Sequence, residues 1–177
     1  MLKIKKRKAA EYIAYSLIIL LGIVIDQITK QLAVKYLSPI DTKPLWEGVL
    51  HLTYVENDGA AFGMLDDNRI LFMLPSTVMI IGMSLYLYLG YAENRIYAYS
   101  VAAIVSGGIG NMIDRIALGY VVDFIDFRLI NFAVFNGADA FVCVGAGFLM
   151  LALILDLVKE IKAAKNKNAD GDVKNDS

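Results

Sequence analysis

The chain has little of what metal, disulfide or nucleic-acid chemistry needs. Its 177 residues include one cysteine, Cys143, which cannot form a disulfide within the chain, and one histidine, His51, which cannot supply a site of several histidines. We therefore expect no metal. The 17 Lys and Arg residues are balanced by 18 Asp and Glu, and no basic aromatic motif stands out, so a nucleic-acid partner is not expected. Hydrophobic residues, by contrast, make up 58% of the chain, above the share usual in soluble domains.

Four apolar stretches predict an all-α membrane protein with four transmembrane helices. Residues 70–92, 96–113 and 140–155 carry no charge, and about 20 apolar residues cross a bilayer. The first stretch, 12–25, is shorter and follows the basic KIKKRK, which is also typical of a cleavable signal peptide. Its continuation, DQITKQLAVKY, offers no small-residue cleavage site and keeps a helical apolar rhythm, so we expect a retained helix. The predicted helices are 10–36, 70–92, 96–115 and 137–158.

Basic residues flank these helices on one side. Five precede the first helix, Arg95 lies between the second and third, and five lysines follow the fourth. The positive-inside rule makes this side cytoplasmic, so both termini are expected in the cytoplasm. Residues 1–158 then form a single membrane-embedded domain. The polar tail 159–177 lacks aromatic residues and is expected to be disordered.

Two connections, 37–69 and 116–136, face the opposite, extracytoplasmic side. In the first, every second residue of VLHLTYVEN falls on one face, which carries Leu50, Leu52 and Tyr54. This alternation predicts a strand, and the turn-rich NDGAAFG follows it. We expect a small β-sheet forming a cradle on the outer membrane surface at the level of the headgroups, because hydrocarbon does not tolerate free sheet edges. Trp46 is expected to anchor it at the interface. The glycines of NDGAAFG could supply a mobile lid.

Polar residues gather at the outer ends of the first and third helices. Asp26 and Lys30 are four residues apart, so they share a helix face and can contact each other or a third group. Asn111, Asp114 and Arg115 likewise share a face after the small residues of GGIG, which would let another helix approach closely. The alternative for the first set is a plain ion pair at a helix end, and the alternative for the second is a helix terminus paired to its neighbours.

Two aspartates near the second outer connection are harder to explain structurally. In an extended VVDFIDF, Asp123 falls on an apolar face, where the pKa of a carboxyl should rise, and Asp126 falls on the other face. Asp139 follows Asn136 at the start of the last helix, where it could simply complement the helix dipole. Two carboxyls brought together would share a proton and could perform aspartic-protease chemistry. The separation of Asp123 and Asp139 in the sequence neither requires nor excludes contact between them.

Other hydrolytic designs fit the sequence less well. There is no H-E-x-x-H motif and no G-x-S-x-G turn for a serine nucleophile. Cys143 lies in the middle of a predicted helix, where we expect it to pack as a small residue, and His51 is expected to be part of the strand. The alternative from another class is a small proton-coupled transporter, whose carboxylates would belong near the bilayer midplane. A structural scaffold is a third reading.

Five motifs together resemble the lipoprotein signal peptidases (signal peptidase II), a family of bacterial membrane aspartyl endopeptidases. They are DQITK, NDGAAFG, GNMIDR, VVDFIDF and FNGAD, in this order, over roughly 12–158. The resemblance implies a monomeric, cofactor-free enzyme of the bacterial cytoplasmic (inner) membrane, with its active site on the extracytoplasmic side. Its substrate would be a prolipoprotein carrying diacylglycerol on a cysteine, cut just before that cysteine while the acyl chains remain in membrane lipid.

The same resemblance implies the site residues. Asp123 and Asp139 would form the catalytic pair. The residues implied to orient this pair or hold substrate are Asp26, Lys30, Asn57, Gly59, Asn111, Asp114, Arg115, Asn136 and Ala138. Gly137 is a departure, because a larger aliphatic residue is expected between Asn136 and Ala138.

Overall fold

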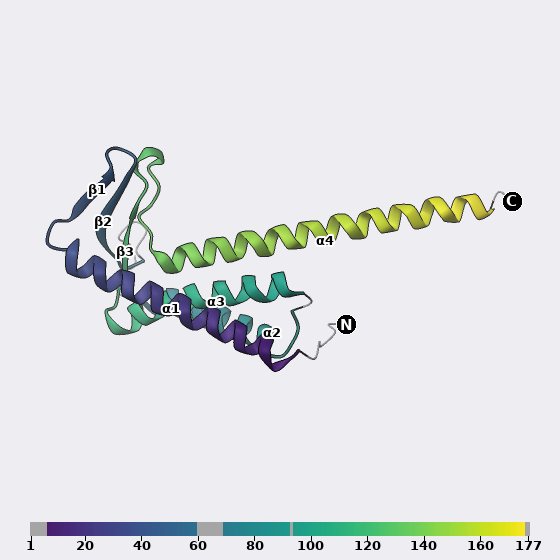
Figure 1. Ribbon diagram of the computed structural model, residues 1–177, viewed down its shortest axis with the longest axis horizontal. Coiled ribbons are helices and arrows are strands. Elements are labelled where there is room, and N and C mark those ends of the chain that lie inside the picture. Colours follow the sequence, from purple (N-terminus) through teal and green to yellow (C-terminus); the bar gives the residue numbers. More distant parts are fainter. Residues whose placement is uncertain (1–6, 60–68, 93, 176–177) are drawn as a thin grey trace.

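The computed structural model describes residues 7–59, 69–92 and 94–175, and the side chains of 69–72 and 166–175 are outside the description. Its helices are α1 (Ala9–Tyr36), α2 (Arg69–Tyr88), α3 (Arg95–Ala117) and α4 (Gly137–Asn175). Helix α3 is central and packs against each of the other three (Figure 1). The mainly helical architecture predicted from the sequence is therefore confirmed.

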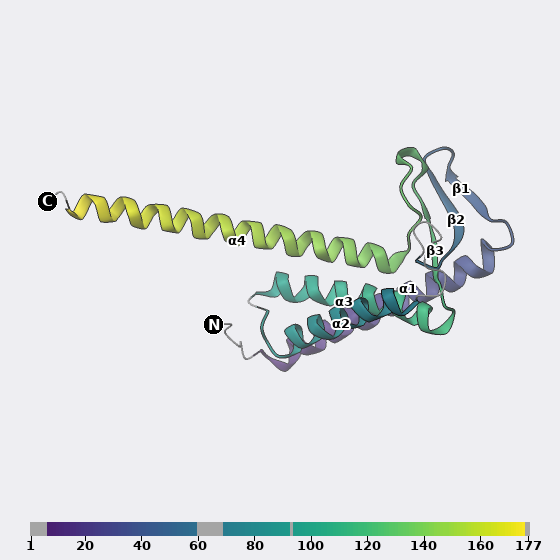
Figure 2. The ribbon, with the colours of Figure 1, turned by 180° about the vertical axis from the view of Figure 1, so that it is seen from behind.

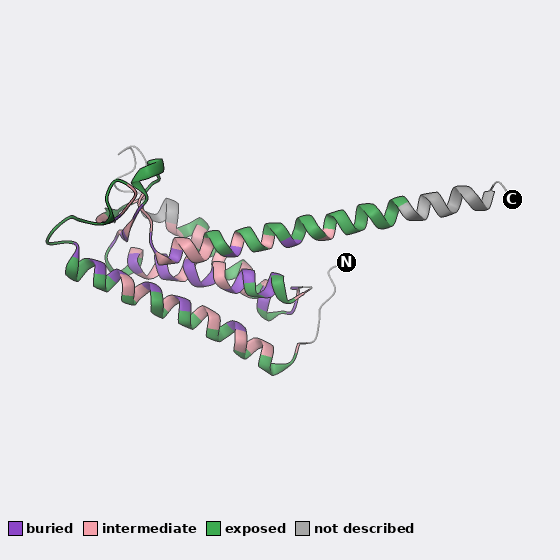
Figure 3. Ribbon diagram, turned by 45° about the horizontal axis from the view of Figure 1, so that its top comes forward, coloured by how far each residue is buried: buried purple, intermediate pink, exposed green. Residues whose placement is uncertain are grey.

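Three helices within the described residues are long and apolar enough to cross a membrane, namely Ala9–Tyr36, Arg95–Ala117 and Gly137–Lys165. The apolar part of α2, Met73–Tyr88, is shorter. The outward faces carry large apolar side chains such as Leu20, while the buried residues lie between the helices (Figure 3). Apolar side chains on the outside of a bundle fit a lipid environment.

Glycines allow the closest helix contacts, as the GGIG motif suggested. A Cβ on Gly107 would collide with the backbone oxygen of Ala138, and one on Gly145 would lie 2.7 Å from the backbone oxygen of Ser100. Both contacts join α3 to α4, and they set the depth at which the start of α4 lies against α3. The position of Asp139 follows from that packing.

A three-stranded antiparallel sheet in the order β1-β2-β3 lies beside the end of α1 and the beginning of α4 (Figures 1 and 2). Its strands are β1 (Thr42–Trp46), β2 (Leu50–Asn57) and β3 (Val121–Asp126), and the 3-10 turn η1 (Arg128–Ile130) follows. The strand predicted from VLHLTYVEN is β2. The register pairs Val55 with Asp123. The second outer connection thus supplies the strand that carries one of the two aspartates.

Two helix ends differ from the prediction by four residues or more, and the other bounds agree within two residues. Helix α2 ends at Tyr88, four residues early, where the chain turns through Gly90 with a positive φ of 82°. Helix α4 continues to Asn175 instead of ending near 158, so residues 159–175, expected to be disordered, belong to a helix. The residues directly after Val158, KEIKAAK, are mostly lysine, glutamate and alanine, which favour helix, and Lys159 pairs with Asp156 at 3.0 Å. Polar composition suggested a coil, although these seven residues favour a helix.

Candidate active site

A buried lysine joins two of the helices that carry the predicted site residues. The Nζ atom of Lys30 lies 2.9 Å from Asp26 Oδ2 on the same helix and 3.0 Å from Asp114 Oδ2 on α3. It also donates a hydrogen bond of 2.9 Å to Asn111 Oδ1. The ammonium group thus has three partners for its three protons. All four side chains are buried, so these charges compensate one another away from water.

Each aspartate of this cluster also fixes a backbone N–H next to one of the candidate catalytic residues. Asp26 Oδ1 accepts a hydrogen bond of 2.8 Å from the N–H of Ala138, which precedes Asp139. Asp114 Oδ2 accepts one of 3.1 Å from the N–H of Val122, which precedes Asp123. The ion cluster therefore touches both the start of α4 and strand β3.

Asn136 and Asp139 form a reciprocal cap at the start of α4. The Asn136 side-chain oxygen accepts from the N–H of Asp139 at 3.0 Å, and Asp139 Oδ2 accepts from the N–H of Asn136 at 3.3 Å. This is a capping box in which asparagine and aspartate take the usual places. The other carboxylate oxygen of Asp139 accepts a bond of 2.7 Å from the amide of Asn111. Asp139 therefore does cap the start of α4, as considered from the sequence. Its side chain nevertheless also contacts Asn111 on α3.

The amide of Asn136 links the two carboxyl groups. Its Nδ2 donates to Asp123 Oδ1 at 2.7 Å and to Asn111 Oδ1 at 3.0 Å. Asn111 Oδ1 thus accepts from both Lys30 and Asn136, which leaves the Asn111 amide nitrogen to donate to Asp139. Asp123 and Asp139 therefore share Asn136 as a neighbour, although 15 residues separate them in sequence.

Asp123 has an environment that disfavours its charged form. Burial raises the pKa of this carboxyl from 3.8 to about 6, and the negative charge of Asp139 acts in the same direction. Hydrogen bonds from Asn57, at 2.8 Å, and from Asn136 oppose the rise in pKa without cancelling it. At neutral pH a carboxyl with this pKa is close to both of its protonation states, as acid–base chemistry requires.

Asn57 owes its orientation to a tight turn. Gly59 adopts a positive φ of 83° and donates its N–H to Asn57 Oδ1 at 2.9 Å. The amide nitrogen of Asn57 is thereby left facing Asp123. Residues 60–63 of the NDGAAFG motif, which the sequence suggested as a lid, lie outside the described residues.

Other residues named from the sequence take no part in this network. Arg115 is half-buried near the end of α3, and among the described residues it makes no hydrogen bond or ion pair with the ion cluster or with either carboxyl. Asp126 accepts hydrogen bonds from Thr53 and Arg128, which, against the effect of burial, hold its pKa below the usual value. His51 is buried in β2, as expected of a strand residue, whereas Cys143 is exposed on α4 instead of packing in the interior.

Gln27 is a residue that the sequence analysis missed. Its amide nitrogen donates to Asp114 Oδ1 at 2.9 Å and to the backbone oxygen of Gly110 at 3.2 Å. It therefore completes the hydrogen bonding of Asp114. Its position in the DQITK motif, between Asp26 and Lys30 of the ion cluster, is the sequence feature that could have identified it. Among the described residues, no three His, Cys, Asp or Glu side chains are grouped so as to hold a metal ion.

Comparison with known proteins identifies the family. The model of the family described as signal peptidase (SPase) II matches residues 18–155. The chain belongs to the signal peptidase II family. A lipoprotein signal peptidase of Caldanaerobacter subterraneus subsp. tengcongensis is 52% identical over 130 residues, covering 72% of this chain and 88% of that protein. One of Halalkalibacterium halodurans is 41% identical over 157 residues, covering 88% and 99%.

A solved structure has the same fold. It is described as a bacterial membrane enzyme determined by the in meso method at 2.3 Å resolution, with a TM-score of 0.74 and 27% identity over 88% of this chain and 94% of that one. The apolar helices and the family together make this chain a bacterial membrane protein with peptidase character. Membership in the family supports the removal of signal peptides from prolipoproteins.

Proposed function

We propose that the chain is an aspartyl endopeptidase that removes the signal peptide from prolipoproteins carrying diacylglycerol on a cysteine, cutting just before that cysteine. The observation that carries the proposal is the pair of carboxyls at Asp123 and Asp139, which Asn136 joins through hydrogen bonds at 2.7 and 3.3 Å. A second carboxyl nearby disfavours the charged form of Asp123, because like charges at short range oppose ionisation. Aspartic proteases work with such a pair.

In this mechanism Asp139 is the base and Asp123 the acid. Asp139 accepts an N–H hydrogen bond at each oxygen, from the Asn111 amide and the Asn136 backbone. Asp123, with a pKa of about 6, holds a proton more readily than an ordinary carboxyl does, which suits the acid. Asp139 removes a proton from a water molecule, whose oxygen attacks the scissile carbonyl carbon, while Asp123 gives its proton to the carbonyl oxygen. When the C–N bond breaks, the proton held by Asp139 passes to the leaving nitrogen, and Asp123 takes a proton from one hydroxyl of the intermediate, which becomes the carboxyl of the released signal peptide.

The surroundings of the two aspartates suit a lipidated substrate. The network joins the ends of α1 and α3 and the start of α4 to a sheet strand, so a peptide bond at the membrane surface could reach it while the acyl chains stay in lipid. We assign this end of the bundle to the extracytoplasmic side of the bacterial inner membrane, with both termini in the cytoplasm. A complete pair of carboxyls in one chain needs no second subunit, and water activation by carboxyls needs no cofactor. A proton-coupled transporter would instead need its carboxylates near the middle of the membrane.

Cleavage by purified protein tests the proposal directly. A diacylglyceryl prolipoprotein in detergent is incubated with the wild type, Asp123→Asn, Asp139→Asn or Asp126→Asn, and the product is followed by gel shift. Asp126 is the matched control, because it lies on the same strand as Asp123 but hydrogen-bonds to Thr53 and Arg128. We expect the wild type and Asp126→Asn to cleave, and the other two variants to remain folded and inactive.

Two results would count against the assignment. If Asp123→Asn and Asp139→Asn cleave as fast as the wild type, these aspartates are not the catalytic pair. If the wild type leaves a verified substrate uncut, the endopeptidase proposal itself is wrong and transport becomes the better reading. Mass analysis of the product locates the cut relative to the lipidated cysteine.

A further inference from the structure

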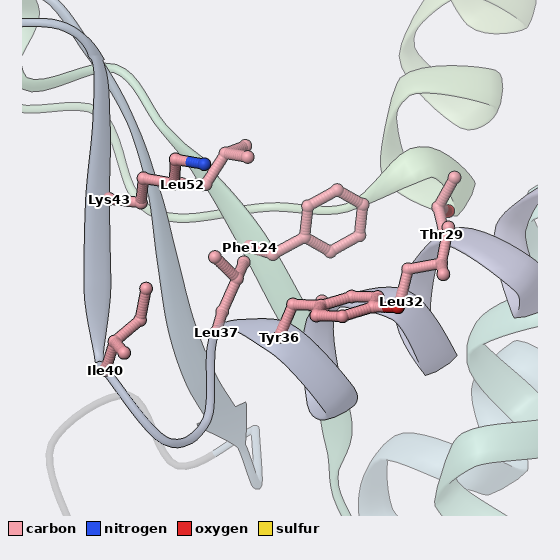
Figure 4. Close-up of a pocket in the computed structure, with 9 residues that line it drawn as sticks. Thr29, Leu32, Tyr36, Leu37, Ile40, Lys43, Leu52 and Phe124 are labelled. Atoms are coloured by element: carbon pink, nitrogen blue, oxygen red, sulfur yellow. The ribbon is translucent and has the colours of Figure 1, made fainter.

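A cavity of about 500 Å³ lies between the last turns of α1 and the sheet (Figure 4). Leu32, Tyr36 and Leu37 line it from the helix side, and Leu52 and Phe124 line it from strands β2 and β3. Its volume falls within the range of roughly 300–1,000 Å³ that is usual for pockets that bind small molecules. None of its lining residues hydrogen-bonds to either candidate catalytic carboxyl.

The cavity and the candidate catalytic carboxyls involve different residues. Phe124 lines the cavity, whereas its neighbour in sequence, Asp123, does not line it and bonds to Asn57 and Asn136. Neither aspartate is part of the lining. A ligand in the cavity would therefore lie beside Phe124 and leave both carboxyls uncovered.

The lining is apolar apart from Lys43 and the hydroxyl groups of Thr29 and Tyr36. The Thr29 hydroxyl is already bonded to the backbone oxygens of Ile25 and Asp26 at 2.9 and 2.8 Å. Lys43 lies on the exposed strand β1, and its ammonium group extends toward Leu52 in Figure 4. Among the described residues no carboxylate comes within 4.0 Å of this ammonium group. An unpaired cation beside an apolar cavity is complementary to a molecule with an anionic group and a hydrocarbon chain.

The position of the cavity along α1 fits the boundary between hydrocarbon and headgroups. At about 1.5 Å per residue the 28 residues of α1 span about 42 Å, more than the roughly 30 Å of a bilayer core. The cavity borders the final turns, where the excess length extends from the hydrocarbon. Trp46, at the end of β1, is exposed, as aromatic residues at a membrane interface commonly are.

We propose that this cavity binds an anionic membrane phospholipid, with part of one acyl chain against Leu32, Leu37 and Phe124 and the phosphate beside Lys43. The lipid would lie between α1 and the sheet and would hold the sheet at a fixed height over the membrane surface. This site is distinct from the place of the lipidated substrate, and the inference does not depend on the proposed peptidase activity.

Native mass spectrometry of the full-length protein in detergent tests the site. Protein is mixed with phosphatidylglycerol or phosphatidylcholine of the same acyl chains, and the fraction that retains one lipid is measured. We expect about fivefold more retention of phosphatidylglycerol, as one basic residue near an anionic lipid provides. Lys43→Gln should remove this preference. Lys35→Gln should not, because Lys35 is on α1 near the cavity but does not line it.

A second variant tests the apolar part of the cavity. Ile40 is exposed, so Ile40→Asp should leave the fold intact while placing a negative charge on the lining, and retention of both lipids should fall. Equal retention of the two lipids by the wild type, or equal effects of Lys43→Gln and Lys35→Gln, would overturn the proposal. So would displacement of phosphatidylglycerol by a diacylglyceryl peptide at equimolar concentration, since the cavity would then belong to the substrate.

Discussion

Removing the charge of Lys30 should destabilise the protein more than any other single loss of charge near the site. Lys30 contacts Asp26, Asp114 and Asn111 at 2.9, 3.0 and 2.9 Å, and its side chain is only 3% exposed. Lys30→Met keeps an unbranched apolar side chain of similar length, but it leaves two buried carboxylates without their cation. Breaking a buried ion pair by removing one partner costs about 3–5 kcal/mol.

The loss can be measured as a shift in thermal unfolding of the purified protein in detergent. A chain of this size loses about 2–4 °C of midpoint for each kcal/mol, so we expect Lys30→Met to unfold about 6–20 °C below the wild type. Lys35→Met is the matched control. It removes an exposed lysine from the same helix, and its effect on the free energy of unfolding should stay within about 0.5 kcal/mol.

A paired variant separates the electrostatic cause from a packing defect. If uncompensated charge is the reason for the loss, adding Asp114→Asn to Lys30→Met should recover part of the stability, because one of the two unpaired carboxylates becomes neutral. Equal unfolding midpoints for Lys30→Met and Lys35→Met would refute the reasoning. A double variant that is less stable than Lys30→Met alone would show that lost packing, and not charge, explains the effect.

Three further variants probe the carboxyl environment and the helix contacts. The Asn57 amide stabilises the charged form of Asp123, so Asn57→Ala should raise the pKa of Asp123 above about 6 and move the alkaline limb of the activity–pH profile to higher pH; an unchanged or lower limb would contradict this. Gly110→Ala would place a methyl group 2.6 Å from Asp26 Oδ2 and should cost about 1–3 kcal/mol of stability in thermal unfolding. Gly137→Ala meets nothing closer than 3.5 Å, so its stability and cleavage rate should stay near those of the wild type, and comparable losses in the two variants would contradict the packing argument.

Local spacing in the sequence predicted several contacts of the site. Asp26 and Lys30, four residues apart on a helix, were expected to share a face, and they form an ion pair at 2.9 Å. Alternation along β3 was expected to place Asp123 and Asp126 on opposite faces; the two residues bond to different partners, and because the register of β2 and β3 shifts between Leu52 and Val55, ideal alternation does not describe this pair of strands. These relations depend only on helix and strand periodicity, which a sequence carries directly.

Contacts between distant segments could not be predicted in this way. The bond from Ala138 to Asp26 spans 112 residues, and it depends on how deeply α4 packs against the other helices. Gln27 was missed because a glutamine beside two charged residues resembles ordinary surface polarity. The length of α4 was misjudged because polar composition was taken as a sign of disorder, although KEIKAAK, directly after Val158, consists mostly of good helix formers.

The ion cluster explains how the chain can hold two carboxyls together. Asp26 accepts from the N–H that precedes Asp139, and Asp114 accepts from the N–H that precedes Asp123. Lys30 joins Asp26 to Asp114, so a single ammonium group fixes the spacing between the backbones of α4 and β3. The negative charge of Asp139 opposes ionisation of Asp123, and without this link the two elements could separate to relieve the repulsion. The buried cation thus acts through Asp26 and Asp114 on the residue that precedes each carboxyl, and it holds the pair close without an ion pair to either member.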